Sequence, residues 1–277
     1  MGAFHAYDIR GVYNKDFDRE TVYRVGYFLP ELLGADKVVV GRDDRESSPE
    51  MHKALLKGIT DAGADVYDLG LATTPMVYFA TGRYGFKASA QITASHNPRE
   101  YNGLKISREN ALPVGFDTGL GKLKEWIETR ELILSGKRGE VHNLDIKKEY
   151  TDFLLKYKTD LGGLKIGMDL SNGMAALLIK DIMGEESDEL HYIFDNMDGT
   201  FPNHEANPLV AENIVDLQRL VSEKRCDIGV IFDGDADRVM FVDENGRFIS
   251  PDLMIALLGH YFLEERGESG PVLQDIR

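Results

Sequence analysis

The chain has 277 residues, 43% of them apolar, enough for one large domain or two ordinary ones with buried cores. Asp and Glu number 47 against 32 Lys and Arg, for a net charge of −15, which argues against nucleic acid and anionic membranes as partners. A single cysteine, Cys226, excludes an internal disulfide, and there is neither a signal-peptide pattern nor an apolar run near the ~18 residues of a membrane helix. We therefore expect a cytoplasmic protein.

The first half of the sequence alternates short β-branched runs with amphipathic segments, which predicts α/β layers. The predicted strands are 37–41, 65–69 and 88–93, and the predicted helices are 48–62, 75–81 and 117–129. Ser48 is the expected N-cap of the first helix, with Pro49 at its first helical position. Ten residues separate Thr93 from the next apolar run, 104–106, which is too short for a parallel crossover. These strands are therefore expected to be antiparallel, in a mixed sheet, and the Gly-rich segment 134–143 is predicted to be a surface turn or linker.

The second half repeats the same alternation. The predicted strands are 164–170, 227–232 and 239–243, and the predicted helices are 175–183, 212–224 and 252–265. Asn245-Gly246 predicts a hairpin, and Ser250-Pro251 caps the last helix. A short apolar segment, 272–276, follows it. We predict tandem three-layer α/β domains with mixed sheets, divided into 1–150, 151–251 and the start of a truncated third domain, 252–277.

A polar loop, Thr93-Ala94-Ser95-His96-Asn97-Pro98, follows the predicted strand 88–93. Serine becomes a good nucleophile only when a base, a metal or covalent modification changes its character. The strand end would fix the Ser95 hydroxyl, and His96 is a neighbouring proton carrier. Taken alone, the segment also fits an ordinary polar turn with an exposed histidine.

Three carboxylates, Asp233, Asp235 and Asp237, follow the predicted strand 227–232, with Arg238 beside them. Carboxylates at this spacing repel one another unless a cation lies between them, and oxygen ligands favour Mg²⁺ or Ca²⁺. An EF-hand loop is disfavoured because Arg238 stands where that loop needs glycine and because strands, not helices, flank it. A solvated acidic turn and a phosphatase that uses Asp233 as its nucleophile remain alternatives.

Arg10 and Lys105 are two further candidate site residues. Arg10, in Tyr7-Asp8-Ile9-Arg10-Gly11, could hold a phosphate bidentately. Lys105 alternates with the apolar Leu104 and Ile106, so it points to the opposite face of its strand. Each of them alone also fits an ordinary surface cation.

Together these segments resemble the α-D-phosphohexomutase family, most closely its phosphomannomutase/phosphoglucomutase branch. The motifs that carry the resemblance are YDIRG (7–11), GRDDRESSP (41–49), TASHNPREYNGLK (93–105), DLSNG (169–173) and DGDADR (233–238). The resemblance implies that Ser95 is a phosphoserine and that one Mg²⁺ is held by its phosphate together with Asp233, Asp235 and Asp237. It also implies that Arg10 and Arg238 lie near the phosphoserine, that Tyr7 and Arg238 bind substrate, and that Lys105 and His96 are candidates for proton transfer. A pKa of Lys105 lowered by neighbouring cations would suit that role.

The activity implied is interconversion of hexose 1-phosphate and hexose 6-phosphate, of mannose and/or glucose, through an enzyme-bound hexose 1,6-bisphosphate. The resemblance leaves the preferred hexose and the oligomeric state open. A phosphoglucosamine mutase of the same family, the Asp233 phosphatase and a catalytically silent binding module are the alternatives. Members of the family have four domains, with a sugar-recognition loop and a phosphate-clamping loop in the later part. Neither loop is found here, so we expect this chain alone to be inactive as a mutase.

Overall fold

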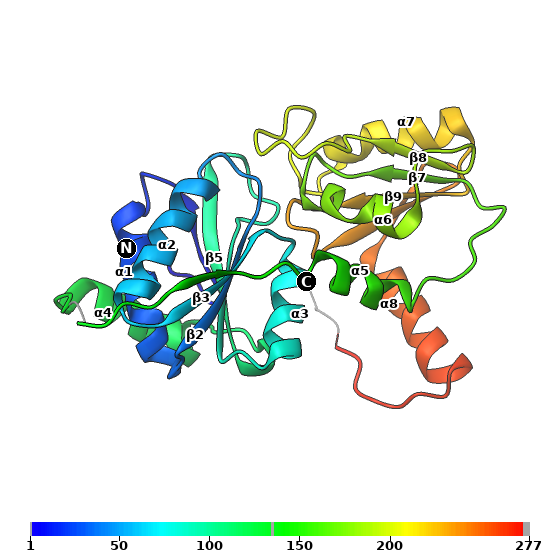
Figure 1. The fold of residues 1–277 in the computed structure, drawn as a ribbon. Helices are drawn as coiled ribbons and strands as arrows, with labels where there is room; N and C mark the ends of the chain where they lie inside the picture. Colours follow the sequence, from blue (N-terminus) through cyan, green and yellow to red (C-terminus); the bar gives the residue numbers. More distant parts are fainter. Residues whose placement is uncertain (1, 134–135, 274–277) are drawn as a thin grey trace.

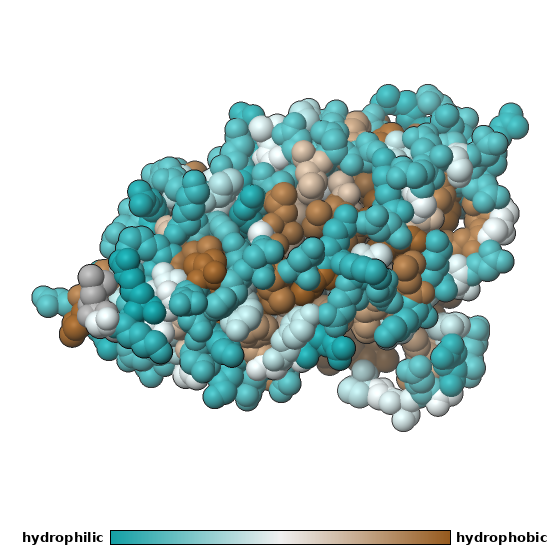
Figure 2. Space-filling view, in the orientation of Figure 1, coloured by the Kyte–Doolittle hydropathy of each residue, from teal (hydrophilic) through white to brown (hydrophobic). Residues whose placement is uncertain are grey.

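The computed structural model describes residues 2–133 and 136–273. Within these residues the chain forms two α/β units side by side (Figure 1), one built on a six-stranded sheet and the other on a five-stranded sheet. None of the helices in this part of the chain combines the length and apolar composition that crossing a bilayer requires. Most of the visible surface is hydrophilic, and apolar side chains gather near the middle of the face in Figure 2, where the two units meet.

The first sheet has the strand order β1-β5-β4-β2-β3-β6. Its strands are β1 (Ile9–Val12), β2 (Lys37–Arg42), β3 (Asp65–Leu71), β4 (Ala88–Ile92), β5 (Tyr101–Arg108) and β6 (Val141–Asn143). Strand β2 is parallel to β3 and β4, whereas β5 is antiparallel to both β4 and β1. The prediction of a mixed sheet, with antiparallel strands on either side of the Ser95 loop, is confirmed.

Helices cover both faces of this sheet. They are α1 (Arg19–Leu33), α2 (Ser48–Asp61), α3 (Thr74–Tyr84), α4 (Gly121–Thr129) and α5 (Lys147–Leu155). Val38 and Val40 of β2 lie in the core with α1, α2 and α4, whereas Val39 lies in a second cluster with α3 and α5. Successive residues of a strand point to opposite faces of the sheet. The two clusters therefore lie on opposite faces, and the unit has three layers: helices, sheet and helices.

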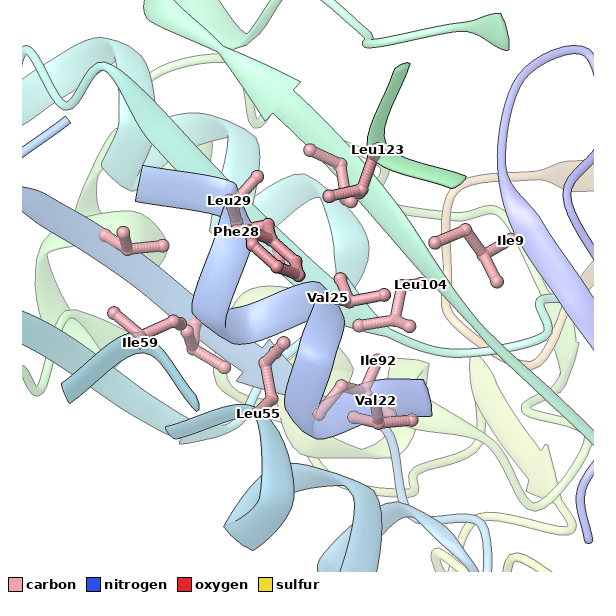
Figure 3. Close-up of a cluster of buried hydrophobic side chains, with 14 of the residues drawn as sticks. Ile9, Val22, Val25, Phe28, Leu29, Leu55, Ile59, Ile92, Leu104 and Leu123 are labelled. Atoms are coloured by element: carbon pink, nitrogen blue, oxygen red, sulfur yellow. The ribbon is translucent and has the colours of Figure 1, made fainter. Parts of the chain in front are cut away.

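Helices α1 and α2 pack closely over the first core. Figure 3 shows Val22, Val25, Phe28 and Leu29 of α1 facing Leu55 and Ile59 of α2. Glycine permits this approach, because a Cβ on Gly58 would lie 2.1 Å from the carbonyl oxygen of Tyr23. Helix α1 has no counterpart among the elements predicted from the sequence.

The second sheet has the order β11-β10-β9-β7-β8. Its strands are β7 (Ile166–Asp169), β8 (Leu190–Ile193), β9 (Ile228–Phe232), β10 (Val239–Asp243) and β11 (Phe248–Ile249), and its helices are α6 (Ile179–Met183), α7 (Val215–Lys224) and α8 (Pro251–His260). Residues of α7 and α6 belong to separate clusters that share this sheet, so the second unit also has three layers. The predicted hairpin at Asn245-Gly246 joins β10 to β11, and Ser250 caps α8.

Several boundaries differ from the predictions. Ser47, not Ser48, is the N-cap of α2, so Pro49 is the second helical residue. Ser48 does not cap the helix because its hydroxyl donates to Asp43. The predicted helices 175–183 and 212–224 each begin as a 3₁₀ turn, at Met174–Leu177 and Ala211–Ile214. Helix α4 is preceded by a π-helical turn, Phe116–Leu120, which a non-helical Gly119 interrupts.

Two predicted segments lie partly outside the described residues, and one predicted domain boundary falls within a helix. The predicted linker 134–143 contains β6, and its residues 134 and 135 lie outside the described residues. Residues 274–276 of the predicted apolar segment also lie outside them. Helix α5 runs across residue 150, so the boundary placed there stays a prediction.

Candidate active site

The Ser95 loop leaves the fully buried strand β4 and returns into β5. Ser95 has a φ of +55°, in the left-handed region that non-glycine residues rarely adopt. Its amide donates to the Thr93 hydroxyl at 2.9 Å, and the amide of Asn97 donates to the carbonyl of Ala94 at 3.1 Å. Ser95 itself is completely buried. The loop is thus a tight, internally bonded turn rather than a solvated one.

The aspartate loop connects β9 to β10 in the second unit. The Asp233 carboxylate closes it, because its Oδ1 accepts from the amides of Asp237 and Arg238, both at 3.1 Å. Two residues after β7, Ser171 and Met174, support this loop. The Ser171 hydroxyl donates to the carbonyl of Phe232 at 2.7 Å, and the Met174 amide donates to the carbonyl of Gly234 at 2.9 Å.

The two loops meet at Ser95 and Asp233, which are 138 positions apart in the sequence. The Ser95 hydroxyl donates to Asp233 Oδ2 at 2.8 Å. A Cβ on Gly234 would lie 2.5 Å from the Ser95 carbonyl oxygen, so only glycine permits this approach. Thr74, at the start of α3, adds a second contact: its amide donates to the Asp235 carbonyl at 3.1 Å, and its hydroxyl donates to the Asp235 carboxylate.

The three carboxylates form a cluster with strong mutual repulsion. Asp233, Asp235 and Asp237 each bring an oxygen within 4.8 Å of the others, and the first two residues are completely buried. Burial, followed by the charges of Asp235 and Asp237, raises the pKa of Asp233 to about 8. Asp235 Oδ1 is buried and has no hydrogen-bond partner among the described residues. An all-oxygen donor set with an unpartnered oxygen fits a hard divalent cation such as Mg²⁺.

A cation already touches this cluster. The Lys105 ammonium lies 2.5 Å from Asp235 Oδ2 and 2.6 Å from Asp237 Oδ2. Burial alone would lower the pKa of Lys105, but these two carboxylates outweigh burial and raise it. The expectation of a lowered pKa is therefore wrong for this arrangement, because anions rather than cations are its nearest neighbours.

His96 lies among cations. Arg238 Nη1 donates to His96 Nδ1 at 2.9 Å, which leaves that nitrogen without a proton. Burial, with the charges of Arg238 and Arg10, lowers the pKa of His96 to about 4, so the imidazole is neutral at pH 7. Arg10 Nη1 donates to Asn97 Oδ1 at 2.7 Å, and Arg10 also pairs with Asp8. The predicted phosphate-binding arginines thus flank the Ser95 loop.

A cleft of about 600 Å³ opens above these groups. Five of the predicted site residues line it: Tyr7, Arg10, Lys105, Asp237 and Arg238. Tyr7 is 80% exposed, free to contact a ligand. Ser95, Asp233 and Asp235 lie beneath the cleft and are buried. The site is therefore a solvent-open cleft, lined by three cations and two carboxylates, next to the buried pairing of the Ser95 hydroxyl with Asp233.

Sequence reasoning missed three residues of this region. Arg45 is completely buried against the Ser95 loop, Thr74 binds Asp235, and Tyr78 lines the cleft. Arg45 lies in the quoted motif 41–49 but had no assigned role. Thr74 precedes a proline at a helix start, which predicts a cap rather than a contact to a distant loop.

Both halves of the chain match families of known proteins. Residues 1–131 match phosphoglucomutase/phosphomannomutase, alpha/beta/alpha domain I, and residues 148–246 match domain II. A phosphomannomutase of Vibrio cholerae is 36% identical over 289 residues, covering 100% of this chain and 62% of that protein. A Xanthomonas campestris protein named phosphohexose mutases is 35% identical over 279 residues, with 100% and 62% covered.

Solved structures agree with the sequence matches. A phosphoglucomutase/phosphomannomutase family protein of Burkholderia thailandensis superposes with a TM-score of 0.85 at 33% identity, covering 95% of this chain and 59% of that one. The chain thus spans less than two thirds of the length of the relatives it matches. The resemblance and the tandem α/β fold are confirmed: the chain belongs to the phosphoglucomutase/phosphomannomutase family.

Proposed function

We propose that this chain carries the phosphoryl-transfer centre of a Mg²⁺-dependent phosphohexomutase, in which Ser95 gives and recovers the phosphoryl group. The observation that carries the proposal is the 2.8 Å hydrogen bond from the Ser95 hydroxyl to Asp233, inside a cluster of three carboxylates. A serine becomes a good nucleophile beside a base or a metal, and this hydrogen bond holds the Ser95 hydroxyl at the proposed cation site. The reaction proposed is interconversion of hexose 1-phosphate and hexose 6-phosphate through a hexose 1,6-bisphosphate.

The cleft supplies charge for this reaction. Phosphoryl transfer depends mainly on positioning and on neutralising the equatorial phosphate oxygens. Arg10, Lys105 and Arg238 line the cleft, and the two arginines flank the Ser95 loop. These cations would bind the phosphate groups of a sugar phosphate, while Tyr7 contacts the sugar at the exposed rim. Lys105 and the neutral His96 are the proposed proton carriers.

The carboxylates of Asp233, Asp235 and Asp237, with a phosphate oxygen on Ser95, would hold the Mg²⁺. When bound, it would neutralise charge on the transferred phosphoryl group. The contacts of the Lys105 ammonium with Asp235 and Asp237 support this proposal, because two of the three carboxylates already attract a positive charge.

The names of the relatives favour mannose and glucose phosphates over other hexoses. The V. cholerae relative is a phosphomannomutase, and the B. thailandensis protein is of the phosphoglucomutase/phosphomannomutase family. A phosphoglucosamine mutase is the alternative within the family. A cytoplasmic location and the division at residues 150 and 251 stay part of the proposal.

A phosphatase that uses Asp233 as nucleophile is less well supported. Both oxygens of Asp233 are engaged, Oδ1 by two amides and Oδ2 by the Ser95 hydroxyl. A phosphoryl group on Oδ2 would displace the Ser95 hydroxyl, and one on Oδ1 would break the bonds that close the loop. Nucleophilic attack by Ser95 leaves those two amide bonds in place.

The test is incubation of the protein and of Ser95→Ala with glucose 1,6-bisphosphate and Mg²⁺, followed by intact-protein mass spectrometry. The expected result is addition of one phosphate to the wild type, mapped to Ser95, and none to the variant. A phosphate that persists in Ser95→Ala would move the nucleophile elsewhere, and turnover of the bisphosphate to inorganic phosphate would favour the phosphatase.

A further inference from the structure

Arg45 is completely buried and makes a set of bonds to the backbone of the Ser95 loop. Its Nη2 donates to the carbonyl oxygens of Ser95 at 2.9 Å and Asn97 at 2.7 Å. Its Nη1 donates to those of Pro98 at 2.7 Å and Tyr101 at 3.0 Å. Four backbone carbonyls between residues 95 and 101 thus converge on one guanidinium.

The charge of Arg45 is balanced by Asp43, a neighbour in the sequence. Its Nε lies 3.2 Å from Asp43 Oδ2, and Asp43 is itself held by the Ser48 hydroxyl and the Arg45 amide. Burying a guanidinium is tolerable only when it is paired and its donors are satisfied. Arg45, at the junction between β2 and α2, is paired with Asp43, and both of its terminal nitrogens donate to carbonyl oxygens, whereas its Nε has no hydrogen-bond partner among the described residues. These bonds give the guanidinium a fixed position from which to hold the loop.

The guanidinium also lies over the ring of Phe201, a residue of the second unit. The Arg45 Cζ lies 4.9 Å from the centroid of the Phe201 ring. Phe201 has a φ of +48°, which is a genuine outlier for a bulky side chain. A Cβ on Gly234 would lie 3.6 Å from the tip of this ring and 2.5 Å from the Ser95 carbonyl oxygen. Arg45 and Phe201 therefore meet where the Ser95 loop touches the aspartate loop.

We propose that Arg45 is a positioning residue which, stacked on Phe201, sets the place of the Ser95 hydroxyl relative to Asp233. The inference deepens the proposed function and rests on it. Arg45 does not line the cleft, so it acts on the reaction through the Ser95 backbone rather than by touching substrate. Lysine could not replace it, because three donors on a flexible stem cannot match four carbonyls that a rigid planar fork satisfies.

The test compares Arg45→Lys with Arg42→Lys, a control in which the arginine Nη1 donates to the Asp43 carbonyl at 3.1 Å rather than to the Ser95 loop. The rate of Ser95 phosphorylation by glucose 1,6-bisphosphate is measured as a function of bisphosphate concentration. In Arg45→Lys we expect the saturating rate to fall ~100-fold, as a small misplacement of a reacting group can do. The half-saturating concentration stays unchanged, since the cleft is intact. Arg42→Lys stays within about twofold of the wild type, because it leaves the Arg45 guanidinium and its four bonds to the loop carbonyls in place.

Amide hydrogen exchange provides a second readout that needs no activity. In Arg45→Lys the amides of the loop 94–101 exchange faster, while those of β7 and β9 keep their protection. If Arg45→Lys does not fold, Phe201→Leu takes its place, with a smaller fall in the saturating rate and faster exchange in the same loop. Wild-type rates together with unchanged loop exchange in the variant would overturn the proposal. Absence of phosphorylation in the wild type would instead reject the proposed function, and loop exchange would still decide the role of Arg45.

Discussion

The Thr74 amide donates to the Asp235 carbonyl at 3.1 Å, and its hydroxyl donates to the carboxylate of the same residue. One residue at the start of α3 thus holds both the backbone and the side chain of a proposed metal ligand that belongs to the other unit. The proposed cation site would therefore depend on the docking of the two units and not on the aspartate loop alone.

Thr74→Val keeps the backbone bond and the side-chain volume but removes the hydroxyl donor. Residues that orient metal ligands typically contribute ~10- to 100-fold to metal affinity, so we expect Mn²⁺ binding to weaken by at least ~10-fold. Titration followed by electron paramagnetic resonance measures this. Thr81→Val is the matched control, because its buried hydroxyl donates to the Val77 carbonyl within α3. Asp235→Asn, which removes a ligand charge, is expected to weaken binding more than Thr74→Val does. Equal Mn²⁺ affinity in Thr74→Val and Thr81→Val would contradict the assigned role.

Gly234→Ala tests the contact between the Ser95 loop and the aspartate loop. The added Cβ would lie 2.5 Å from the Ser95 carbonyl oxygen, so one of the loops has to move. We expect Ser95 phosphorylation to fall by ~100-fold, because a shift of about 1 Å at a reacting centre has an effect of this size. Mass spectrometry at timed intervals measures the rate.

Gly82→Ala is the control for that substitution. Gly82 lies within α3, and a Cβ there would have no atom within 4 Å. Alanine stabilises a helix by ~0.5–1 kcal/mol relative to glycine, so this variant is expected to be at least as stable as the wild type. An unchanged phosphorylation rate in Gly234→Ala would show that the loops tolerate separation.

The sequence predicted the chemistry of the site better than the contacts that hold it. Ser95 and the three aspartates follow strands, and strand ends meet at sheet edges, so their positions could be inferred from pattern. The proximity of Ser95 and Asp233, 138 positions apart, could be expected only from the resemblance. No pattern of neighbouring residues predicts that two loops on separate sheets will meet.

Electrostatics and buried cations were harder to foresee. The pKa of Lys105 is raised because Asp235 and Asp237 face it, and the sequence does not show which charges a side chain will meet in another unit. Arg45 looks like any surface arginine in a charged segment. Its role becomes visible only when the backbone carbonyls of a distant loop are placed around it.

The pair of His204 and Asp169 anchors the loop that carries Phe201. His204 Nε2 lies 3.0 Å from Asp169 Oδ2, and His204 Nδ1 lies 2.8 Å from the carbonyl oxygen of Glu205. Both nitrogens therefore face acceptors, as in a protonated imidazole. Burial opposes that charge, but the hydrogen bond and charge of Asp169 outweigh it and raise the pKa of His204.

This geometry predicts a pH dependence of stability with a definite sign. The folded state binds the His204 proton more tightly than the unfolded chain, in which histidine has a pKa of about 6.5. The stabilisation is fully present below pH ~6.5 and is lost as the pH rises through the higher pKa of the folded state. His204→Gln retains hydrogen bonding but cannot carry the charge. We expect urea unfolding to show a large difference in free energy between wild type and His204→Gln at pH 6 and a smaller one at pH 9. A difference that is constant with pH would show that His204 is neutral in the folded protein and that a plain hydrogen bond, not an ion pair, anchors this loop.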